Sequence, residues 1–380
     1  MQAIHFGAGK IGRSFIGAVL RKAGYELCFA DVDQETIDLI NRERQYTIHV
    51  LDLAPYDERI EDVSAVHTSS AALLSKFETA DVVTTAVSMK VLPLIAPRIA
   101  EGILRRMDSQ NPAPVNIMCC ENGIRATSQL KAMVYEHLSA EGRAWADRHV
   151  GFADSSVDRI VPLSAYEHPL DVATEAFFEW NIDRSQLRGT LPTIPGMRLT
   201  DNLTAHIERK LFTVNTGHCA TAFLGNIKGY TYIHECMDDK DVRQTTRAIM
   251  QQSGRALIAS YGFAPGDHEE YIERVLGRFS NPHIKDQTAR VGHDPRRKLG
   301  PMLYFSHPVT MALKHRLPTD MLCLAIAAGM TEKIEGDPQC DEIEQLVRQK
   351  GPAQAAREIT GQTDTLVIQQ ITDAYNTLNT

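Results

Sequence analysis

The sequence predicts an α/β chain, in which a doubly wound parallel sheet is followed by a mostly α-helical C-terminal domain. Over about the first 160 residues, short apolar runs alternate with helical stretches, which is typical of a parallel sheet. From residue 201 onward nearly every segment has helical period instead. At roughly 150 residues per domain, a chain of 380 residues is long enough for both parts. We expect domains at residues 1–190 and 191–380.

The predicted strands follow one another at regular intervals. The first strand, 2–6, precedes a glycine loop and an apolar-periodic helix that ends at Gly24. Segment 47–50 is interpreted as part of an inserted hairpin, and 189–196, with two prolines, as a linker. The further sheet strands are expected at 26–30, 63–67, 80–87, 115–120 and 153–161. Helices are expected at 202–224, 241–261, 269–278 and 319–330, with two more at the C-terminus.

Charge and cysteine usage narrow the class of protein. The chain has 40 basic and 48 acidic residues, a net charge of -8, so no general nucleic-acid or membrane-surface partner is expected. Its seven cysteines are scattered without CxxC spacing, which favours reduced thiols and a cytoplasmic location. There is no long apolar run to span a membrane, and the immediate first strand argues against a signal peptide. No spacing of cysteines and histidines indicates a metal site.

The glycine loop indicates a dinucleotide site of the Rossmann type. Residues 7–12 read G-x-G-x-x-G between a strand and a helix, with Asp31 at the end of the next strand. The acid is placed to bind the ribose hydroxyls, and it would repel a 2′-phosphate, so NAD is expected rather than NADP. The structural alternative is a glycine turn with a solvated aspartate. The expected cofactor-binding residues are Phe6, Gly7, Ala8, Gly9, Lys10, Ile11, Gly12, Asp31 and, after a later strand, Ala86.

A second candidate site lies on the helix that begins the second domain. At about 100° per residue, Asn215 lies roughly 140° and His218 roughly 80° around the helix from Lys210. A desolvated lysine can act as a base near neutral pH, and Asn215 and His218 could donate to substrate hydroxyls. On spacing alone, a surface lysine and a satisfied core histidine remain the simpler interpretation.

Several motifs identify a family resemblance that runs essentially end to end. They are HFGAGKIGRSFIG at 5–17, FADVD at 29–33, TTAV at 84–87, CENG at 120–123, VDRIVP at 157–162, ERKLFTVNTGH at 208–218, GRFSNPHIKD at 277–286 and RVGHDPRRKL at 290–299. With them the chain resembles the polyol-specific long-chain dehydrogenases. The resemblance implies a metal-independent, NAD-linked polyol oxidoreductase with a Rossmann domain and a helical domain.

The resemblance also assigns roles. It implies that Lys210 is the catalytic base, supported by Asn215, His218, Asn122 and Asp158. Asn122 and Asp158 also lie near the C-terminal ends of predicted strands, where ligands bind in open α/β sheets. Arg290 and Lys298 match substrate-contacting positions in a basic segment that would otherwise be interpreted as a solvated charge run.

The implied reaction is reversible oxidation of D-mannitol 1-phosphate to D-fructose 6-phosphate, by a chain expected to be a monomer. After Leu299 the sequence reads GPMLYFSHP, where phosphate-specific members typically carry an acidic–arginine pair. Free mannitol, an arabinitol or a hexuronate therefore stays open as the substrate. A catalytically silent NAD(H)-binding regulator is the alternative of a different class, against which the presence of Lys210, Asn215 and His218 argues.

Overall fold

The computed structural model describes residues 1–110, 113–162 and 166–379, and it divides the chain into two compact units. The units are Met1–Leu203 and Thr204–Thr380. The expected boundary at residue 190 falls in a loop of the first unit, and the segment expected as a linker, 189–196, joins two paired strands there. Each unit has its own hydrophobic core.

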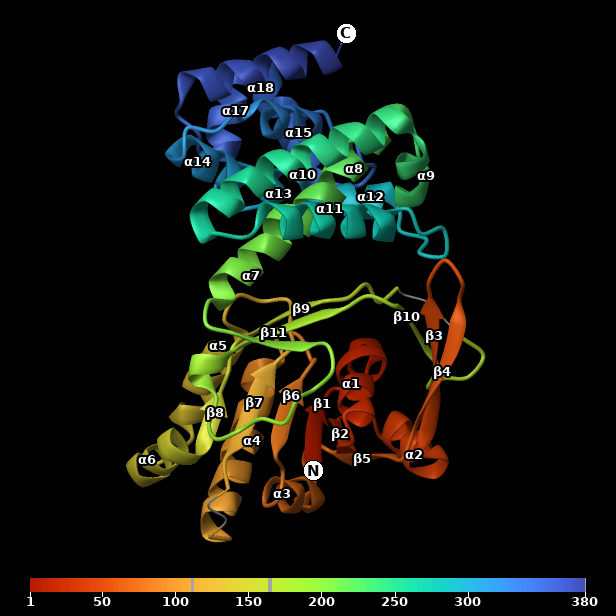
Figure 1. Ribbon diagram of the computed structural model, residues 1–380, viewed down its shortest axis with the longest axis vertical. Coiled ribbons are helices and arrows are strands. Elements are labelled where there is room, and N and C mark those ends of the chain that lie inside the picture. Colours follow the sequence, from red (N-terminus) through yellow and green to blue (C-terminus); the bar gives the residue numbers. More distant parts are fainter. Residues whose placement is uncertain (111–112, 163–165, 380) are drawn as a thin grey trace. The chain divides into compact units, whose positions relative to one another are not determined.

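A six-stranded parallel sheet forms the centre of the first unit, in the order β5-β2-β1-β6-β7-β8 (Figure 1). The chain builds the sheet outward from β1 to β2 and β5, then returns to the other side of β1 for β6. The reversal between β1 and β6 is the topological switch point, where open α/β sheets bind ligands. The strands of this sheet are β1 (Gln2–Phe6), β2 (Glu26–Asp31), β5 (Val63–His67), β6 (Val82–Thr85), β7 (Val115–Cys119) and β8 (Val150–Phe152).

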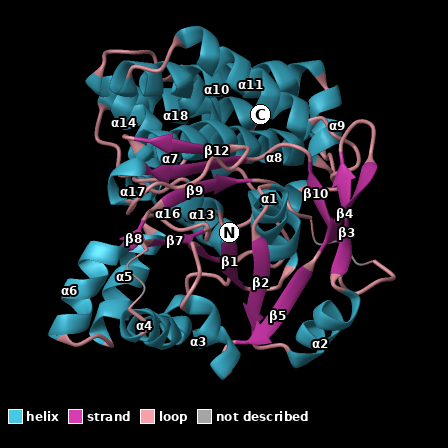
Figure 2. Ribbon diagram, turned by 60° about the horizontal axis from the view of Figure 1, so that its bottom comes forward, coloured by secondary structure: helices cyan, strands magenta, loops and turns pink. Residues whose placement is uncertain are grey.

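The two faces of this sheet are covered differently. One face packs against helices that bury Leu73, Ile99 and Leu130, and Figure 2 shows α4, α5 and α6 gathered beside β7 and β8. The other face packs against the first helix and two small sheets, with Tyr46 and Trp180 in its core. Because both faces are covered, the strands are mostly apolar and do not alternate strictly between apolar and polar residues. The helical segments are η1 (Gly12–Gly17), α1 (Ala18–Lys22), α2 (Gln34–Glu43), α3 (Ala71–Phe77), α4 (Leu92–Asp108), α5 (Ala126–Glu136), α6 (Ala140–His149) and η2 (Arg184–Gln186).

The small sheets confirm one prediction and correct another. The expected hairpin is β3 with β4, and β10 adds to it in parallel. The strand expected at 153–161, however, is wrong as a member of the parallel sheet, because β8 occupies that place. Within that range β9 pairs antiparallel with β11 in the second small sheet, a partner that no local pattern encodes. The strands are β3 (Gln45–Leu51), β4 (Tyr56–Glu61), β9 (Ser155–Asp158), β10 (Val172–Glu175), β11 (Glu179–Asp183) and β12 (Met197–Thr200).

The second unit is helical around one apolar helix, α15, whose residues from Ala325 to Met330 are all buried. Helices α8, α10 and α18 pack against it. The expected pair of C-terminal helices is wrong: α16, α17 and α18 follow α15, because Gly351 and Gly361, both at positive φ, interrupt the helical period. The segments are α7 (Leu203–Arg209), η3 (Lys210–Asn215), α8 (Thr216–Lys228), α9 (Ile233–Asp238), α10 (Lys240–Tyr261), α11 (Pro265–Phe279), α12 (Thr288–Gly292), α13 (Pro295–Lys298), α14 (Ser306–Lys314), α15 (Asp320–Met330), α16 (Pro338–Lys350), α17 (Pro352–Thr360) and α18 (Thr365–Leu378).

Two further observations concern the described part of the chain. All seven cysteines are free and buried. None of the helices in ranges 1–110, 113–162 and 166–379 combines the length and apolar character needed to cross a membrane.

Candidate functional site

The glycine loop leaves β1 at the topological switch point. The Gly7 N–H donates to the carbonyl of Ala30 at 2.9 Å, and the Ala86 N–H donates to the carbonyl of Phe6 at 2.8 Å. These bonds extend the parallel ladder past the strand ends and fix the loop between β2 and β6. Phe6 and Ala86 therefore flank the crevice in which an open α/β sheet holds its ligand.

The three fingerprint glycines fit the approach of a dinucleotide. Gly7 has φ +101°, and a Cβ there would lie 2.7 Å from the Ala86 carbonyl oxygen. A Cβ on Gly12 would collide with the Gly7 carbonyl oxygen. Beside Gly9, in contrast, a Cβ would meet no atom within 4 Å. Gly7 and Gly12 thus permit the tight turn, and Gly9 leaves open space where a pyrophosphate could reach the backbone.

The rest of the loop presents a mixed surface. The helix begins at Lys10, whose side chain is half-buried, and the start of a helix favours an anion. Ala8 is buried, whereas Ile11 keeps 48% of its surface exposed. These residues offer a backbone cradle with one exposed apolar side chain.

Asp31 ends β2 and ties that strand to the loop. One carboxylate oxygen accepts from Ala8 N at 2.5 Å, and the other accepts from Val32 N at 2.7 Å and Asp33 N at 3.1 Å. A carboxylate has about four lone-pair sites, so these bonds leave capacity for one more donor. The position fits a ribose hydroxyl, and the acidic side chain disfavours a 2′-phosphate.

Glu121 is a buried acid that the sequence prediction missed, although it stands beside Asn122. Both of its oxygens accept from the Thr85 hydroxyl, at 2.8 and 2.7 Å, and Oε1 accepts from Val87 N at 2.9 Å. Burial raises the pKa of Glu121 above its ordinary value, against the lowering effect of these donors. Glu121 therefore joins the end of β7 to the end of β6, while Asn122 is exposed just beyond it. The available signal was an acid placed just after a mostly apolar strand.

Asp158 lies on one of the two small sheets of the first unit. It ends β9 and opposes Glu179 across the antiparallel pair with β11, with 7% of its surface exposed. The expectation that it follows a strand of the parallel sheet is wrong, because β9 belongs to a small sheet. Its neighbour Arg159 donates to the carbonyls of Glu175 and Ser14.

The lysine helix contains an irregularity that the sequence did not predict. Between α7 and α8 the helix widens into the π-helical segment η3, where the Thr216 N–H bonds to the carbonyl of Leu211, five residues earlier. Each turn there takes one extra residue, so Asn215 lies one turn beyond Lys210 instead of about 140° around the axis. The regular-helix angles predicted from the sequence are therefore wrong. Lys210, Asn215 and His218 are all half-buried.

Hydroxyl groups support this widened turn. Ser253, fully buried on α10, donates to the carbonyl of Phe212 at 2.5 Å. The Thr216 hydroxyl donates to the carbonyls of Leu211 and Tyr304 at 3.2 and 2.5 Å. Such turns occur frequently at functional sites.

His218 belongs to a charged cluster with Asp286 and Arg290. Its Nε2 lies 2.9 Å from Oδ2 of Asp286, and its ring stacks on Phe279 with the centroids 5.0 Å apart. Arg290 donates through Nε and Nη2 to Oδ1 of the same aspartate, at 2.9 and 2.5 Å. Burial opposes ionisation of Asp286, but its bond to His218 and the nearby positive charges outweigh burial and lower its pKa. Asp286 closes the GRFSNPHIKD motif, but nothing local in the sequence marks it as the partner of His218.

Lys298 is buried rather than presented to solvent. Its ammonium group donates to the carbonyls of Val291 and His293, at and just beyond the end of α12, and burial lowers its pKa. It therefore holds the short helix that carries Arg290. Glu332, which accepts from Asn226 at 2.7 Å, is buried nearby, and burial raises its pKa to about 8.

One group of possible metal ligands occurs among the described residues. His293, Asp294 and Asp337 have ligand atoms within 4.8 Å of one another. Both oxygens of Asp337, however, accept from backbone N–H groups, those of Asp294 at 2.7 Å and Gln339 at 2.9 Å. This bonding already accounts for the buried acid as a helix cap.

The two units match two family models. Residues 1–196 match the Mannitol dehydrogenase Rossmann domain, and residues 202–379 match the Mannitol dehydrogenase C-terminal domain. Among solved structures, a D-sorbitol dehydrogenase in substrate-free form has a TM-score of 0.84 at 15% sequence identity, over 99% of this chain and 93% of that one. The mannitol 2-dehydrogenase of Pseudomonas fluorescens, in a ternary complex with NAD and D-mannitol, has a TM-score of 0.73 at 21% identity, over 100% and 92%. These structures share the fold, and the family models cover nearly the whole sequence. The chain therefore belongs to the mannitol dehydrogenase family of NAD-dependent polyol oxidoreductases.

Proposed function

We propose that this chain interconverts D-mannitol 1-phosphate and D-fructose 6-phosphate, the mannitol-1-phosphate 5-dehydrogenase reaction, with Lys210 as the general base. The observation that carries the proposal is the π-helical turn, which brings Asn215 one turn from Lys210. A regular helix of the same sequence would separate these two side chains. The family membership supplies the class of reaction, and the basic residue Arg290 supports the phosphate ester as substrate.

The cofactor is NAD, which supplies a hydride acceptor when it is bound. The first unit holds it with the open backbone at Gly9, the helix start at Lys10 and the carboxylate of Asp31. The mannitol 2-dehydrogenase of similar fold was solved with NAD, in agreement with this assignment.

Lys210 accepts the proton of the substrate C5 hydroxyl as the C5 hydride leaves. For this step the lysine must be neutral. The Asn215 amide has no hydrogen-bond partner in the described ranges, so its N–H groups are available to the developing alkoxide. His218, oriented by Asp286, donates to a second substrate oxygen.

Asn122 and Asp158 are proposed catalytic residues through the resemblance alone, and Arg290 and Lys298 are proposed substrate-binding residues on the same basis. Arg290 is 64% exposed at its side chain and uses two of its nitrogens for Asp286. Its Nη1 group remains to bind a phosphate oxygen. In this proposal Lys298 contributes to substrate binding by holding α12, the helix that carries Arg290, in position.

The test compares NADH oxidation with fructose 6-phosphate and with free fructose, for the wild type and Lys210→Ala. Turnover of the phosphate ester alone, lost in the variant while NADH still binds, supports both substrate and base. NADH fluorescence measures binding independently of turnover. Undiminished turnover by Lys210→Ala contradicts the assignment of the base.

A free polyol or keto sugar is the second candidate substrate, and one observation favours it. The charges of Arg290 and Lys298 are already engaged by Asp286 and by backbone carbonyls. Arg290→Gln separates the candidates. It raises KM for fructose 6-phosphate by about tenfold or more if the arginine binds phosphate, because charged hydrogen bonds contribute about 1.5–3 kcal/mol. It leaves the KM for a free sugar nearly unchanged if the substrate has no phosphate.

A further inference from the structure

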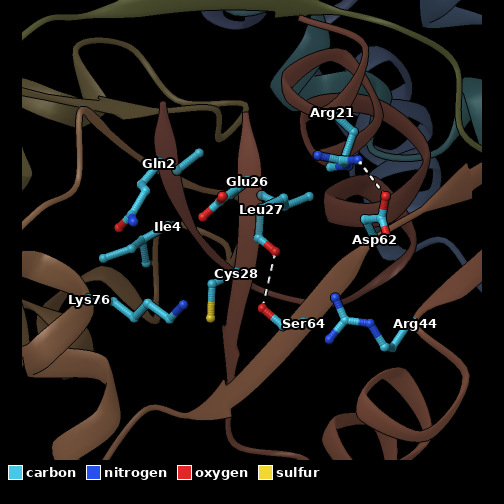
Figure 3. A pocket seen from close by; sticks show the side chains of 11 residues that line it. Gln2, Ile4, Arg21, Glu26, Leu27, Cys28, Arg44, Asp62, Ser64 and Lys76 are labelled. Carbon is cyan, nitrogen blue, oxygen red and sulfur yellow. Dashed lines mark hydrogen bonds and ion pairs between the residues drawn. The ribbon is translucent and has the colours of Figure 1, made fainter. Parts of the chain in front are cut away.

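A cavity of about 420 Å³ opens in the first unit at the amino-terminal edge of the parallel sheet (Figure 3). Its wall includes Gln2 at the start of β1, Glu26 at the start of β2, and Ser64 near the start of β5. The glycine loop and Asp31 follow the opposite ends of β1 and β2. The cavity is therefore separate from the cofactor crevice, and its size is that of a small-ligand pocket.

Positive charge predominates around this cavity. Arg21, Arg44 and Lys76 line it, together with the acids Glu26 and Asp62, which gives a net charge of +1. Three successive helices supply the cations, because Arg21 lies in the last turn of α1, Arg44 caps α2 and Lys76 lies in the last turn of α3. Positive charge at a helix C-terminus is favourable in itself. The favourable interaction with the helix ends alone, however, does not explain why all three side chains line the same cavity.

Only one of these cations is neutralised by an ion pair within ranges 1–110, 113–162 and 166–379. Arg21 lies 3.5 Å from Oδ2 of Asp62 and also donates to the carbonyls of Glu61 and Tyr25. Arg44 and Lys76 have no side-chain hydrogen bond or ion pair in the described part of the chain. Two positive groups therefore line the same cavity without a direct counter-charge.

The unpaired cations face polar groups on the floor of the cavity. In Figure 3 the side chains of Lys76 and Arg44 enter from opposite sides, with Lys76 pointing toward Cys28 and Arg44 toward Ser64. The Ser64 hydroxyl donates to the carbonyl of Leu27 at 3.3 Å, a long bond that it can exchange for a better acceptor. Burial raises the pKa of the Cys28 thiol, so that thiol stays neutral and does not balance Lys76.

We propose that this cavity is a second anion site, which binds the phosphate group of a small molecule between Arg44 and Lys76 with the Ser64 hydroxyl as a further donor. Two monocations match the charge of a phosphate dianion, and both can make charge-assisted hydrogen bonds to its oxygens. The same chemistry accepts inorganic phosphate or a sugar phosphate, so the experiment includes both.

The test is calorimetric titration of the full chain saturated with NAD, which fills the glycine loop. Inorganic phosphate is titrated in one arm and fructose 6-phosphate in the other. The proteins are the wild type, Arg290→Gln, the double variant Arg44→Gln/Lys76→Gln, and the matched control Arg42→Gln/Lys333→Gln. The control removes the same charge at exposed positions outside the cavity. Circular dichroism checks that every variant is folded.

The proposal predicts binding in the wild type that persists in Arg290→Gln and weakens about tenfold or more in the cavity double variant. Binding of phosphate alone identifies the free ion as the ligand, and binding of both identifies a phosphate-ester site. Equal binding by the cavity variant and the wild type overturns the proposal, as does equal weakening in the control. Loss of all binding in Arg290→Gln also overturns it, while leaving the proposed substrate site intact.

Discussion

Removing the hydroxyl of Ser253 tests whether the widened turn beside Lys210 depends on support from α10. Ser253→Ala removes a fully buried hydroxyl group, and with it the hydrogen bond of 2.5 Å to the carbonyl of Phe212. A buried hydrogen bond contributes about 1 kcal/mol, and a carbonyl left unpaired costs up to about 3 kcal/mol. We therefore expect the segment from α7 to α8 to lose about 1–3 kcal/mol of local stability.

Hydrogen exchange is the appropriate assay, because a chain of two units need not unfold in one step. The expected loss corresponds to roughly 5- to 150-fold faster exchange of the amides in η3 and the first turn of α8. If the turn also relaxes toward a regular helix, Asn215 rotates away from Lys210, and kcat falls while NADH binding is unchanged.

Ser260→Ala is the matched control on the same helix. Its hydroxyl lies 3.0 Å from Nε2 of His315 at an exposed position, so its loss should be nearly neutral. Exchange in Ser253→Ala that is no faster than in Ser260→Ala would refute the reasoning, since the buried hydroxyl would then contribute nothing to the turn.

Three further predictions concern the first unit. Asp31→Asn should lower the ratio of kcat/KM for NAD to kcat/KM for NADP by about tenfold or more. The ribose of NAD loses a charged hydrogen-bond acceptor, and the 2′-phosphate of NADP is no longer repelled. An unchanged ratio would contradict the role of Asp31 in binding the ribose. Burial raises the pKa of Glu121 in the folded state, so its contribution to stability is complete at low pH and is lost as pH rises through that pKa. Glu121→Gln should remove this decline, and urea unfolding from acid to alkaline pH should show a flatter profile than the wild type, whereas parallel profiles would exclude the effect. Gly12→Ala should raise the KM for NAD, because the new Cβ collides with the Gly7 carbonyl oxygen. Gly9→Ala, where the space is open, should keep the fold and lose affinity for NAD only because the methyl group blocks the approach of the pyrophosphate. An unchanged KM in both variants would argue against this loop as the cofactor site.

Much of the parallel sheet was predictable because its strands are buried on both faces. The run 2–6 and the run 63–67 match β1 and β5, since a short, mostly apolar run between helices is typical of a strand in a covered parallel sheet. The sixth strand was not predictable in the same way. Only Val150–Phe152 belongs to the sheet, directly after a helix, and within the longer segment expected beyond it β9 pairs with β11 instead.

The residues of the candidate site also fall into those that the local sequence predicts and those that it does not. The glycine loop and Asp31 are local in sequence, and their spacing alone places them at the switch point. The surroundings of His218 and Asn215 are different in kind, because Asp286, which contacts His218, is distant in the sequence, and the position of Asn215 depends on a π-helical turn. Neither a side-chain contact between distant segments nor a change of helical pitch has a periodic signature in the sequence.

The small sheet formed by β3, β4 and β10 has a consequence for the order in which the chain folds during synthesis. β3 pairs with β4 as a local hairpin, but its other edge pairs with β10, so that Ile48 lies opposite Val172. On the ribosome, the hairpin therefore emerges long before the strand that covers its edge. An exposed edge can pair with another chain, so the nascent first unit should be most prone to aggregation until residue 175 has emerged.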